Sequence, residues 1–274
     1  MSVSQNDCLV PAGVRRSEVL VRRNGQTSTG SDWLAEEVPV ALVFNGISHA
    51  VMMATPADLE DFALGFAKTE GLLLDQAELR GVDIREVAEG VEVHLEVSAA
   101  CEWRLKERRR TLAGRTGCGL CGTDSLSMVR QSPVRLADAT IRQGAVATAM
   151  NALRELQPRQ LLTGATHAAA LCRLDGTPRL VREDVGRHNA LDKLIGAALR
   201  EKFQSQEHFI AITSRASFEM VQKATQAGVS VLAAVSAPTS MAVDVAVESN
   251  LLLIGFARPD GMVAYSFPER LVLE

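Results

Sequence analysis

The alternation of apolar and polar positions first becomes regular at residue 38, where it predicts a β-hairpin. The runs 38–44 and 47–53 are rich in apolar and β-branched residues, and Asn45-Gly46 stands between them. Asn-Gly between two such runs is a strong signal for a two-residue hairpin turn. The preceding sequence is polar, and we expect residues 1–35 to form a poorly ordered lead-in.

The next pattern predicts an amphipathic helix that begins at Thr55 and ends at Gly71. Thr55 offers a capping hydroxyl, and Pro56 suits the first turn of a helix. An apolar stripe follows at helical spacing: Leu59, Phe62, Ala63 and Phe66. Strict alternation at 91–97 then predicts a half-buried strand.

Helical and strand patterns alternate from residue 137 onward. We expect helices at about 141–156, 188–202, 216–227 and 241–249, strands at 168–173, 180–182, 209–213, 229–235 and 251–256, and an edge hairpin at 263–266. Such alternation is typical of a parallel or mixed sheet with helices on both faces. The sequence therefore predicts an α/β protein, α+β overall, with a smaller N-terminal α+β domain.

Composition narrows the classes of function. The 274 residues have a formal net charge of −4 and are 47% hydrophobic, which argues against both a disordered chain and a nucleic-acid-binding one. The first residues lack the apolar core of a secretory signal, and no apolar run approaches the ~18 residues of a membrane helix. Five cysteines are too few and too scattered for a disulfide framework. We expect a cytoplasmic protein that binds neither nucleic acid nor membrane.

Cys118 and Cys121 form the clearest chemical motif. They lie in the glycine-rich segment 115–122, close to the arginine-rich stretch 106–110. Glycines leave the sulfurs uncovered, and nearby positive charge favours the reactive thiolate. A zinc site would require two more ligands and no second close cysteine pair exists, so we expect no metal. A thioredoxin-like redox pair remains a rival, although that motif normally opens a helix after a strand.

The other candidates are less distinctive. The remaining cysteines are expected to be incidental or buried thiols: Cys8, Cys101 and Cys172. Glu183 and Asp184 suit either acid–base chemistry or capping and ion pairing. His167 suits a hydrogen-bonded place in the core, whereas His188 lies at a predicted helix start and could contact a phosphate or a base.

Three loops follow predicted strands and should share one edge of the sheet: 214–217, 236–240 and 255–261. Ligands of open α/β sheets bind at that edge, and helix starts there favour phosphate. Ser214 and Arg215 in the first loop and Arg258 in the third could contact such an anion. We expect a site of nucleotide size, although no standard glycine fingerprint is present.

Five segments in this order resemble the formate dehydrogenase accessory sulfurtransferases of the FdhD/NarQ type: 36–42, 115–122, 163–170, 183–193 and 214–221. The resemblance extends from residue 36 to the C-terminus. It implies an N-terminal domain at 36–136 that ends in the cysteine loop. It also implies a cofactor-binding, cytidine deaminase-like three-layer α/β/α domain at 137–274.

The resemblance also implies a function. Members of the family take persulfide sulfur from a cysteine desulfurase and deliver it to the molybdenum cofactor, bis-molybdopterin guanine dinucleotide, for a formate dehydrogenase apoenzyme. Cys118 would then carry the persulfide and Cys121 would help to relay it. The family's cofactor-contacting segment maps to Phe256, Ala257, Arg258, Pro259, Asp260 and Gly261. The resemblance further implies a homodimer and a pocket in which GDP or GMP partly mimics the cofactor.

Two classes of function remain open at this point. One is an enzyme in the sense of sulfur transfer through Cys118. The other is a non-catalytic chaperone that binds the cofactor, with Cys118 and Cys121 as a redox-active pair. Deaminase chemistry is not expected despite the implied fold, because the His-x-Glu and Pro-Cys-x-x-Cys signature of zinc deaminases is absent.

Overall fold

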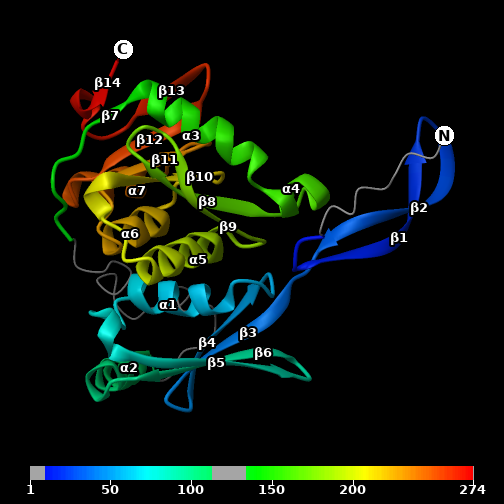
Figure 1. Cartoon of the computed structure of the whole chain (residues 1–274), viewed down its shortest axis with the longest axis horizontal. Helices are drawn as coiled ribbons and strands as arrows, with labels where there is room; N and C mark the ends of the chain where they lie inside the picture. The colour runs from blue at the N-terminus through cyan, green and yellow to red at the C-terminus, as the bar shows by residue number, and fades with distance from the viewer. Residues whose placement is uncertain (1–9, 113–133, 274) are drawn as a thin grey trace.

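The computed structural model describes residues 10–112 and 134–273, which form a projecting hairpin, a four-stranded sheet with two helices, and a layered α/β unit (Figure 1). Within these ranges no helix is both long and apolar enough to cross a membrane. The mixed α/β class predicted from the sequence is confirmed.

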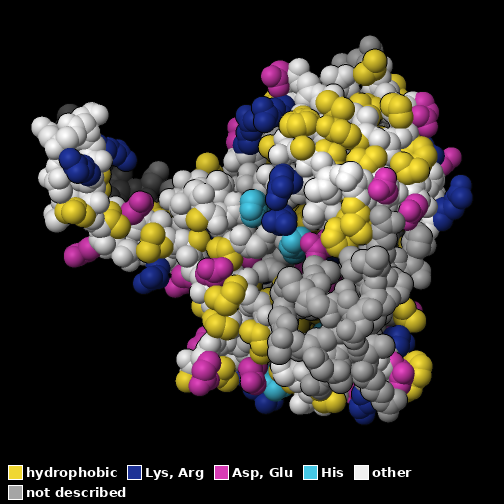
Figure 2. Space-filling model, turned by 180° about the vertical axis from the view of Figure 1, so that it is seen from behind, with side chains coloured by type: hydrophobic (Ala, Val, Ile, Leu, Met, Phe, Trp, Pro, Cys, Tyr) yellow, Lys and Arg dark blue, Asp and Glu magenta, His cyan; other side chains and the backbone are white. Residues whose placement is uncertain are grey.

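A long antiparallel hairpin stands where the sequence pattern indicated a poorly ordered lead-in. Strand β1 (Val14–Arg23) pairs along its whole length with β2 (Gln26–Ala35), and Asn24 and Gly25 both have left-handed φ at the turn. The prediction was wrong for these residues because most side chains of both strands are at least partly exposed, so no apolar alternation marks them. The hairpin projects from the body and carries basic side chains (Figure 2).

The second part is a mixed sheet in the order β4-β3-β6-β5. Its strands are β3 (Val38–Phe44), β4 (Ile47–Ala54), β5 (Leu79–Val87) and β6 (Gly90–Val97). The predicted Asn45-Gly46 turn is confirmed, since both residues have positive φ between β3 and β4. The 3₁₀ turn η1 (Gln76–Glu78) and the helices α1 (Leu59–Thr69) and α2 (Ala99–Leu112) complete this part.

The cap of helix α1 lies three residues later than the sequence predicts, although the apolar stripe of the helix is buried as expected. Thr55 is not the cap, and the capping position is Asp58, in a left-handed conformation. The reason is tertiary: the Thr55 N–H donates to the Asp184 carboxylate, and its carbonyl accepts from the Lys193 ammonium. These buried contacts outweigh the local capping preference.

The third part is built on a six-stranded sheet in the order β13-β12-β11-β10-β8-β9. Its strands are β8 (His167–Arg173), β9 (Pro178–Asp184), β10 (His208–Ile212), β11 (Val231–Ala234), β12 (Leu252–Arg258) and β13 (Gly261–Ala264). Strands β10, β11 and β12 run parallel, and the other pairs are antiparallel. The predicted mixed sheet is confirmed.

Helices cover both faces of this sheet, which gives three layers (Figure 1). Helix α3 (Gln143–Glu155) packs on one face, and α5 (Arg187–Arg200), α6 (Phe218–Gln226) and α7 (Ser240–Glu248) pack on the other. Successive residues of β8 alternate between the two cores, as a central strand requires. The smaller elements are β7 (Ile141–Arg142), α4 (Pro158–Thr163), η3 (Ser205–Glu207), η4 (Pro268–Arg270) and β14 (Leu271–Val272). The helix expected from residue 141 begins at Gln143, because β7 pairs with β14.

Two glycines set how closely the N-terminal part approaches this layered unit. A Cβ on Gly65 of α1 would lie 1.8 Å from the Asp192 carbonyl oxygen, and one on Gly196 of α5 would lie 1.9 Å from the Asp61 carbonyl oxygen. No side chain fits at either position without moving a helix backbone. The two helices therefore cross at backbone contact, which fixes the middle of α5 against α1 of the N-terminal part.

Candidate functional site

The three loops expected to share one sheet edge are joined there by backbone hydrogen bonds. The Ala216 N–H donates to the Ala237 carbonyl, and the Thr239 N–H donates to the Ala216 carbonyl. The third loop joins through the Phe256 N–H, which donates to the Ser236 carbonyl. The carboxyl ends of β10, β11 and β12 therefore present a continuous surface, as the topology rule for open sheets predicts.

The candidate contact residues occupy this surface in different ways. Ser214 is buried, and its hydroxyl donates to the carbonyl of Arg215, whose side chain is exposed. Phe256 combines an exposed side chain with a left-handed φ of 48°, a conformation that costs energy outside glycine and is concentrated at functional sites. Ala257 is buried, whereas Arg258 is exposed at the end of β12. The turn after it consists of exposed Pro259 and Asp260 and half-buried Gly261.

Apart from His188 Nε2, which faces the Glu219 carboxylate, two polar atoms near the starts of α5 and α6 are buried without a hydrogen-bond partner among the described residues. They are Arg187 Nε, in the first turn of α5, and Ser217 Oγ, at the capping position of α6. An unsatisfied buried donor costs about 1–3 kcal/mol, so each group gains if a ligand supplies an acceptor. Helix starts favour negatively charged ligands.

His188 lies beside Arg187 and pairs with a carboxylate. Its Nε2 is 2.9 Å from a carboxylate oxygen of Glu219 in α6, and this contact lowers the pKa of Glu219. The pair links the first turns of α5 and α6. Figure 2 shows such a grouping of histidine, basic and acidic side chains near the middle of one face.

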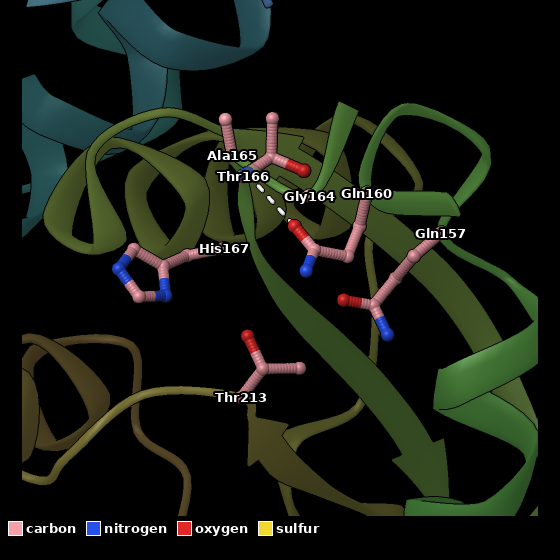
Figure 3. A pocket seen from close by; sticks show the side chains of 7 residues that line it. All are labelled: Gln157, Gln160, Gly164, Ala165, Thr166, His167 and Thr213. Atoms are coloured by element: carbon pink, nitrogen blue, oxygen red, sulfur yellow. Dashed lines mark hydrogen bonds between the residues drawn. The ribbon is translucent and has the colours of Figure 1, made fainter. Parts of the chain in front are cut away.

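A polar pocket of about 390 Å³ opens where β8 begins and β10 ends (Figure 3). Its lining residues are Gln157, Gln160, Gly164, Ala165, Thr166, His167 and Thr213. His167 is not the core histidine that its sequence context allowed, since it borders this pocket. Burial lowers the pKa of His167, and the neighbouring Arg187 and His188 lower it further. The sequence gives no signal for Gln157 and Gln160, because neither residue belongs to a recognisable motif. Only the neighbouring segment 163–170 is part of one.

Glu183 and Asp184 bind backbone N–H groups and a lysine at this edge of the sheet. Glu183 accepts hydrogen bonds from the backbone N–H groups of Arg159 and Gln160 at the start of α4. Asp184 pairs with Lys193 at 2.6 Å and accepts from the Gly186 N–H just before α5. Both carboxylates are buried and fully engaged, so the structure favours capping and ion pairing over acid–base chemistry.

The candidate catalytic residues Cys118 and Cys121 lie outside the described residues. Two other cysteines are described, Cys101 and Cys172, and both are buried free thiols, as expected from the sequence. Burial raises the pKa of both, and that of Cys172 rises to about 12. Residues 10–112 and 134–273 contain no cluster of side chains suited to a metal ion.

Cys101 and Cys172 should therefore resist iodoacetamide in the folded protein, because the thiolate is the reactive form and both pKa values are raised. Alkylation at about pH 8, followed by peptide mass spectrometry, measures this. The same protein unfolded in urea is the control, and there both thiols should label. Labelling of Cys172 in the folded protein as fast as in the unfolded protein would contradict its burial.

Comparison with known proteins adds to this geometry. The model of the FdhD/NarQ family matches residues 35–272. A "Sulfur carrier protein FdhD" of Bordetella petrii is 50% identical over 98% of this chain and 96% of its own. The protein of the same name from Variovorax paradoxus is 55% identical over 90% of this chain and 89% of its own.

A solved structure shares the fold. The crystal structure of a candidate formate dehydrogenase accessory protein from Desulfotalea psychrophila matches with a TM-score of 0.74. The match covers 94% of this chain and 99% of that chain, at 23% sequence identity. At that identity the likeness concerns the fold alone.

Proposed function

Since this chain belongs to the FdhD/NarQ family, we propose that it carries sulfur in the maturation of a formate dehydrogenase. The sulfur arrives as a persulfide from a cysteine desulfurase and is transferred to the molybdenum cofactor, bis-molybdopterin guanine dinucleotide. Here the cofactor is the substrate of the protein. The apoenzyme and the desulfurase are its partners, and the working form is a homodimer.

The transfer step assigned to Cys118 and Cys121 needs no external reductant, because the two thiols themselves supply the electrons that release the sulfur as sulfide. The Cys118 thiolate attacks the outer sulfur of the desulfurase persulfide, and the desulfurase thiolate leaves. The Cys121 thiolate then attacks the Cys118 sulfur, so that the persulfide bond breaks and sulfide departs toward the cofactor. The dithiol supplies the two electrons and becomes a disulfide, which a cellular thiol must reduce before the next cycle.

One observation carries this proposal: exposed arginines on the joined loops at the sheet edge lie near buried donors that have no hydrogen-bond partner among the described residues. The arginines are Arg215 and Arg258, and the donors are Arg187 Nε at the start of α5 and Ser217 Oγ at the start of α6. A dinucleotide cofactor carries several separated phosphates, and guanidinium groups bind phosphate with parallel hydrogen bonds. Holding the cofactor at several points also fixes the acceptor for sulfur transfer.

Arg258→Ala should weaken binding of guanosine diphosphate by about tenfold or more, because it removes a charge-assisted contact. Loading of sulfur onto Cys118 by a desulfurase and free cysteine should be unchanged. Calorimetry measures the first quantity, and the mass gain of the intact protein and of its Cys118 peptide measures the second. Arg85→Ala, which removes an exposed arginine from β5 of the N-terminal sheet, is the matched control.

Three outcomes would count against the proposal. If sulfur loads only onto Cys8, Cys101 or Cys172, Cys118 is not the carrier. If Arg258→Ala abolishes loading in a protein that remains folded, cofactor binding and sulfur acceptance are not separate functions. Equal affinity for guanosine and adenosine diphosphates would leave a general phosphate site and remove support for a guanine-bearing cofactor.

A further inference from the structure

The β1–β2 hairpin has two outer edges that no further strand covers. Among the described residues it forms a sheet of its own, of two strands only. We propose that the outer edge of β1 binds an acidic, extended segment of the formate dehydrogenase apoenzyme, which adds to the hairpin as a third strand. This inference rests on the proposed function, because that function supplies the apoenzyme as a partner.

The hairpin has little to stabilise it apart from its own pairing. The strands pair along their whole length, yet most of their side chains are at least partly exposed, and Leu20 of β1 is 72% exposed. A two-stranded hairpin is only marginally stable in water, and a long uncovered edge is a template for pairing with another chain. Figure 2 shows the hairpin standing clear of the body. A strand from a partner would supply the missing cover.

The base of the hairpin is anchored to the body. Arg159 Nε donates to the Ala12 carbonyl at 2.7 Å, just before β1 begins. The Glu36 N–H donates to the Gly13 carbonyl at 2.9 Å, which closes the base between the two strands. These contacts fix where the hairpin leaves the body, and they leave the outer edge of β1 without a partner strand.

Hairpin geometry decides which backbone groups of β1 point outward. The turn consists of Asn24 and Gly25, both with positive φ, and Arg23 pairs with Gln26 across it. In a hairpin with a two-residue turn the flanking pair is hydrogen-bonded, and bonded and non-bonded pairs then alternate. Every second residue of β1, Glu18 among them, therefore directs its N–H and C=O away from β2. This row of free donors and acceptors is what strand addition requires.

The charge of β1 selects an acidic segment. The strand carries four exposed arginines: Arg15, Arg16, Arg22 and Arg23. Glu18 is the one acidic side chain of β1, and β2 has no basic side chain at all. Arg16 donates to the Ser31 hydroxyl, and the other three arginines form no ion pair with any described residue. Because successive residues point to opposite faces, acidic side chains of an added strand would meet arginines on both faces.

The position of the hairpin favours the apoenzyme over the desulfurase as the partner. Strand β2 packs against α4, whose Gln160 lines the polar pocket of the candidate site. Figure 1 shows α2, which precedes the cysteine segment, and β7, which follows it, on the side of the molecule away from the hairpin. In the proposed function the apoenzyme receives the cofactor, whereas the desulfurase must reach the cysteines. A partner held by the hairpin is close to the candidate cofactor site.

Arg22→Glu/Arg23→Glu tests the charge of this edge. The probe is the formate dehydrogenase apoenzyme, purified from cells that lack this protein, and biolayer interferometry measures its affinity. We expect it to bind the variant about tenfold or more weakly, and its affinity for the wild type to fall as salt is raised, because exposed charges are screened. Arg80→Glu/Arg85→Glu is the matched control. It makes the same charge change on β5, an edge strand of the N-terminal sheet, and should leave the affinity unchanged.

Glu18→Pro separates strand addition from charge attraction, because the two predict opposite results. Loss of the carboxylate should strengthen binding to an acidic segment, whereas loss of the outward N–H should weaken binding about tenfold or more. Glu18→Gln removes the charge and keeps the N–H, so it should bind the apoenzyme at least as tightly as the wild type does. Thr29→Pro makes the same backbone change at the outer edge of β2 and should have no effect.

The inference is wrong if the apoenzyme does not bind the wild-type protein, binds Arg22→Glu/Arg23→Glu as tightly as the control, or binds Glu18→Pro as tightly as Glu18→Gln. Equal losses of affinity with both proline variants would mean that the β1 edge is not the docking site. If Glu18→Pro changes the sedimentation of the protein alone but not its affinity for the apoenzyme, the edge pairs with a second copy instead.

Sulfur loading of Cys118, measured on the same preparations, reports on the proposed function independently. Normal loading together with apoenzyme binding that does not depend on the hairpin would overturn only this inference. Failure of the wild-type protein to load sulfur would instead count against the proposed function itself.

Discussion

A Cys118→Ala variant should leave the partner formate dehydrogenase at background activity, while it still binds guanosine diphosphate like the wild-type protein. The reason is chemical: alanine has no thiolate to accept or hold a persulfide, and Cys121, the other thiol of the glycine-rich segment, would have no second thiolate beside it to release a bound sulfur. The measurement is formate oxidation in cells that lack their own copy of this protein and express the variant.

Cys172→Ala is the matched control for loss of a thiol. Cys172 is buried in β8 with a pKa raised to about 12, so it should take no part in sulfur transfer. Its replacement should preserve dehydrogenase activity. An active dehydrogenase with Cys118→Ala would show that the protein serves as a cofactor-binding chaperone and that the cysteine pair is only a redox latch.

The sequence predicted most of the layered unit, because its strands are buried on both faces and its helices have one apolar side. The runs 209–213 and 229–235 anticipate β10 and β11 to within a few residues. Buried positions require apolar residues, so the spacing of apolar residues along the sequence indicates which strands and helices are buried. The fold name, cytidine deaminase-like, stays a prediction from the resemblance.

Elements that bury little were missed. The β1–β2 hairpin is exposed, so only the turn residues Asn24 and Gly25 could have indicated it, and they were interpreted as part of a loose segment. Thr55 was misassigned for the opposite reason. Its contacts with Asp184 and Lys193 come from residues about 130 positions later, and no local rule can anticipate them.

The candidate site was predicted in part. Topology alone placed the loops after β10, β11 and β12 at one edge, and the structure joins them by hydrogen bonds. The orientation of Gln157 and Gln160 in the polar pocket could not be predicted, since it depends on the Leu153 carbonyl and the Thr166 N–H. Hydrogen-bond direction is a property of the folded chain and has no signature in residue spacing.

A buried ion pair joins helices α5 and α6 of the layered unit to the end of α1 in the N-terminal part. Lys223 of α6 lies 3.0 Å from Asp192 of α5, and it also contacts Thr69 and Glu70 at the end of α1. Burial alone would lower the pKa of Lys223, but the two carboxylates outweigh it and raise the pKa above its usual value. The ammonium also lies 5.6 Å from the centre of the Phe66 ring. Three helices therefore meet at one charge.

Lys223→Met should lower the free energy of unfolding by about 3–5 kcal/mol, because it leaves the Asp192 carboxylate buried without its cation. The double variant Asp192→Leu/Lys223→Met should recover much of that loss, since no unpaired charge then remains inside. Urea denaturation measures the free energy of unfolding of the wild type, Lys223→Met and the double variant.

Arg85→Met, which breaks the exposed pair with Asp83, is the control and should lower the free energy of unfolding by at most about 1 kcal/mol. A Lys223→Met protein as stable as this control would mean that the buried pair does not join the helices. A double variant less stable than Lys223→Met would mean that the loss comes from packing rather than from a stranded charge.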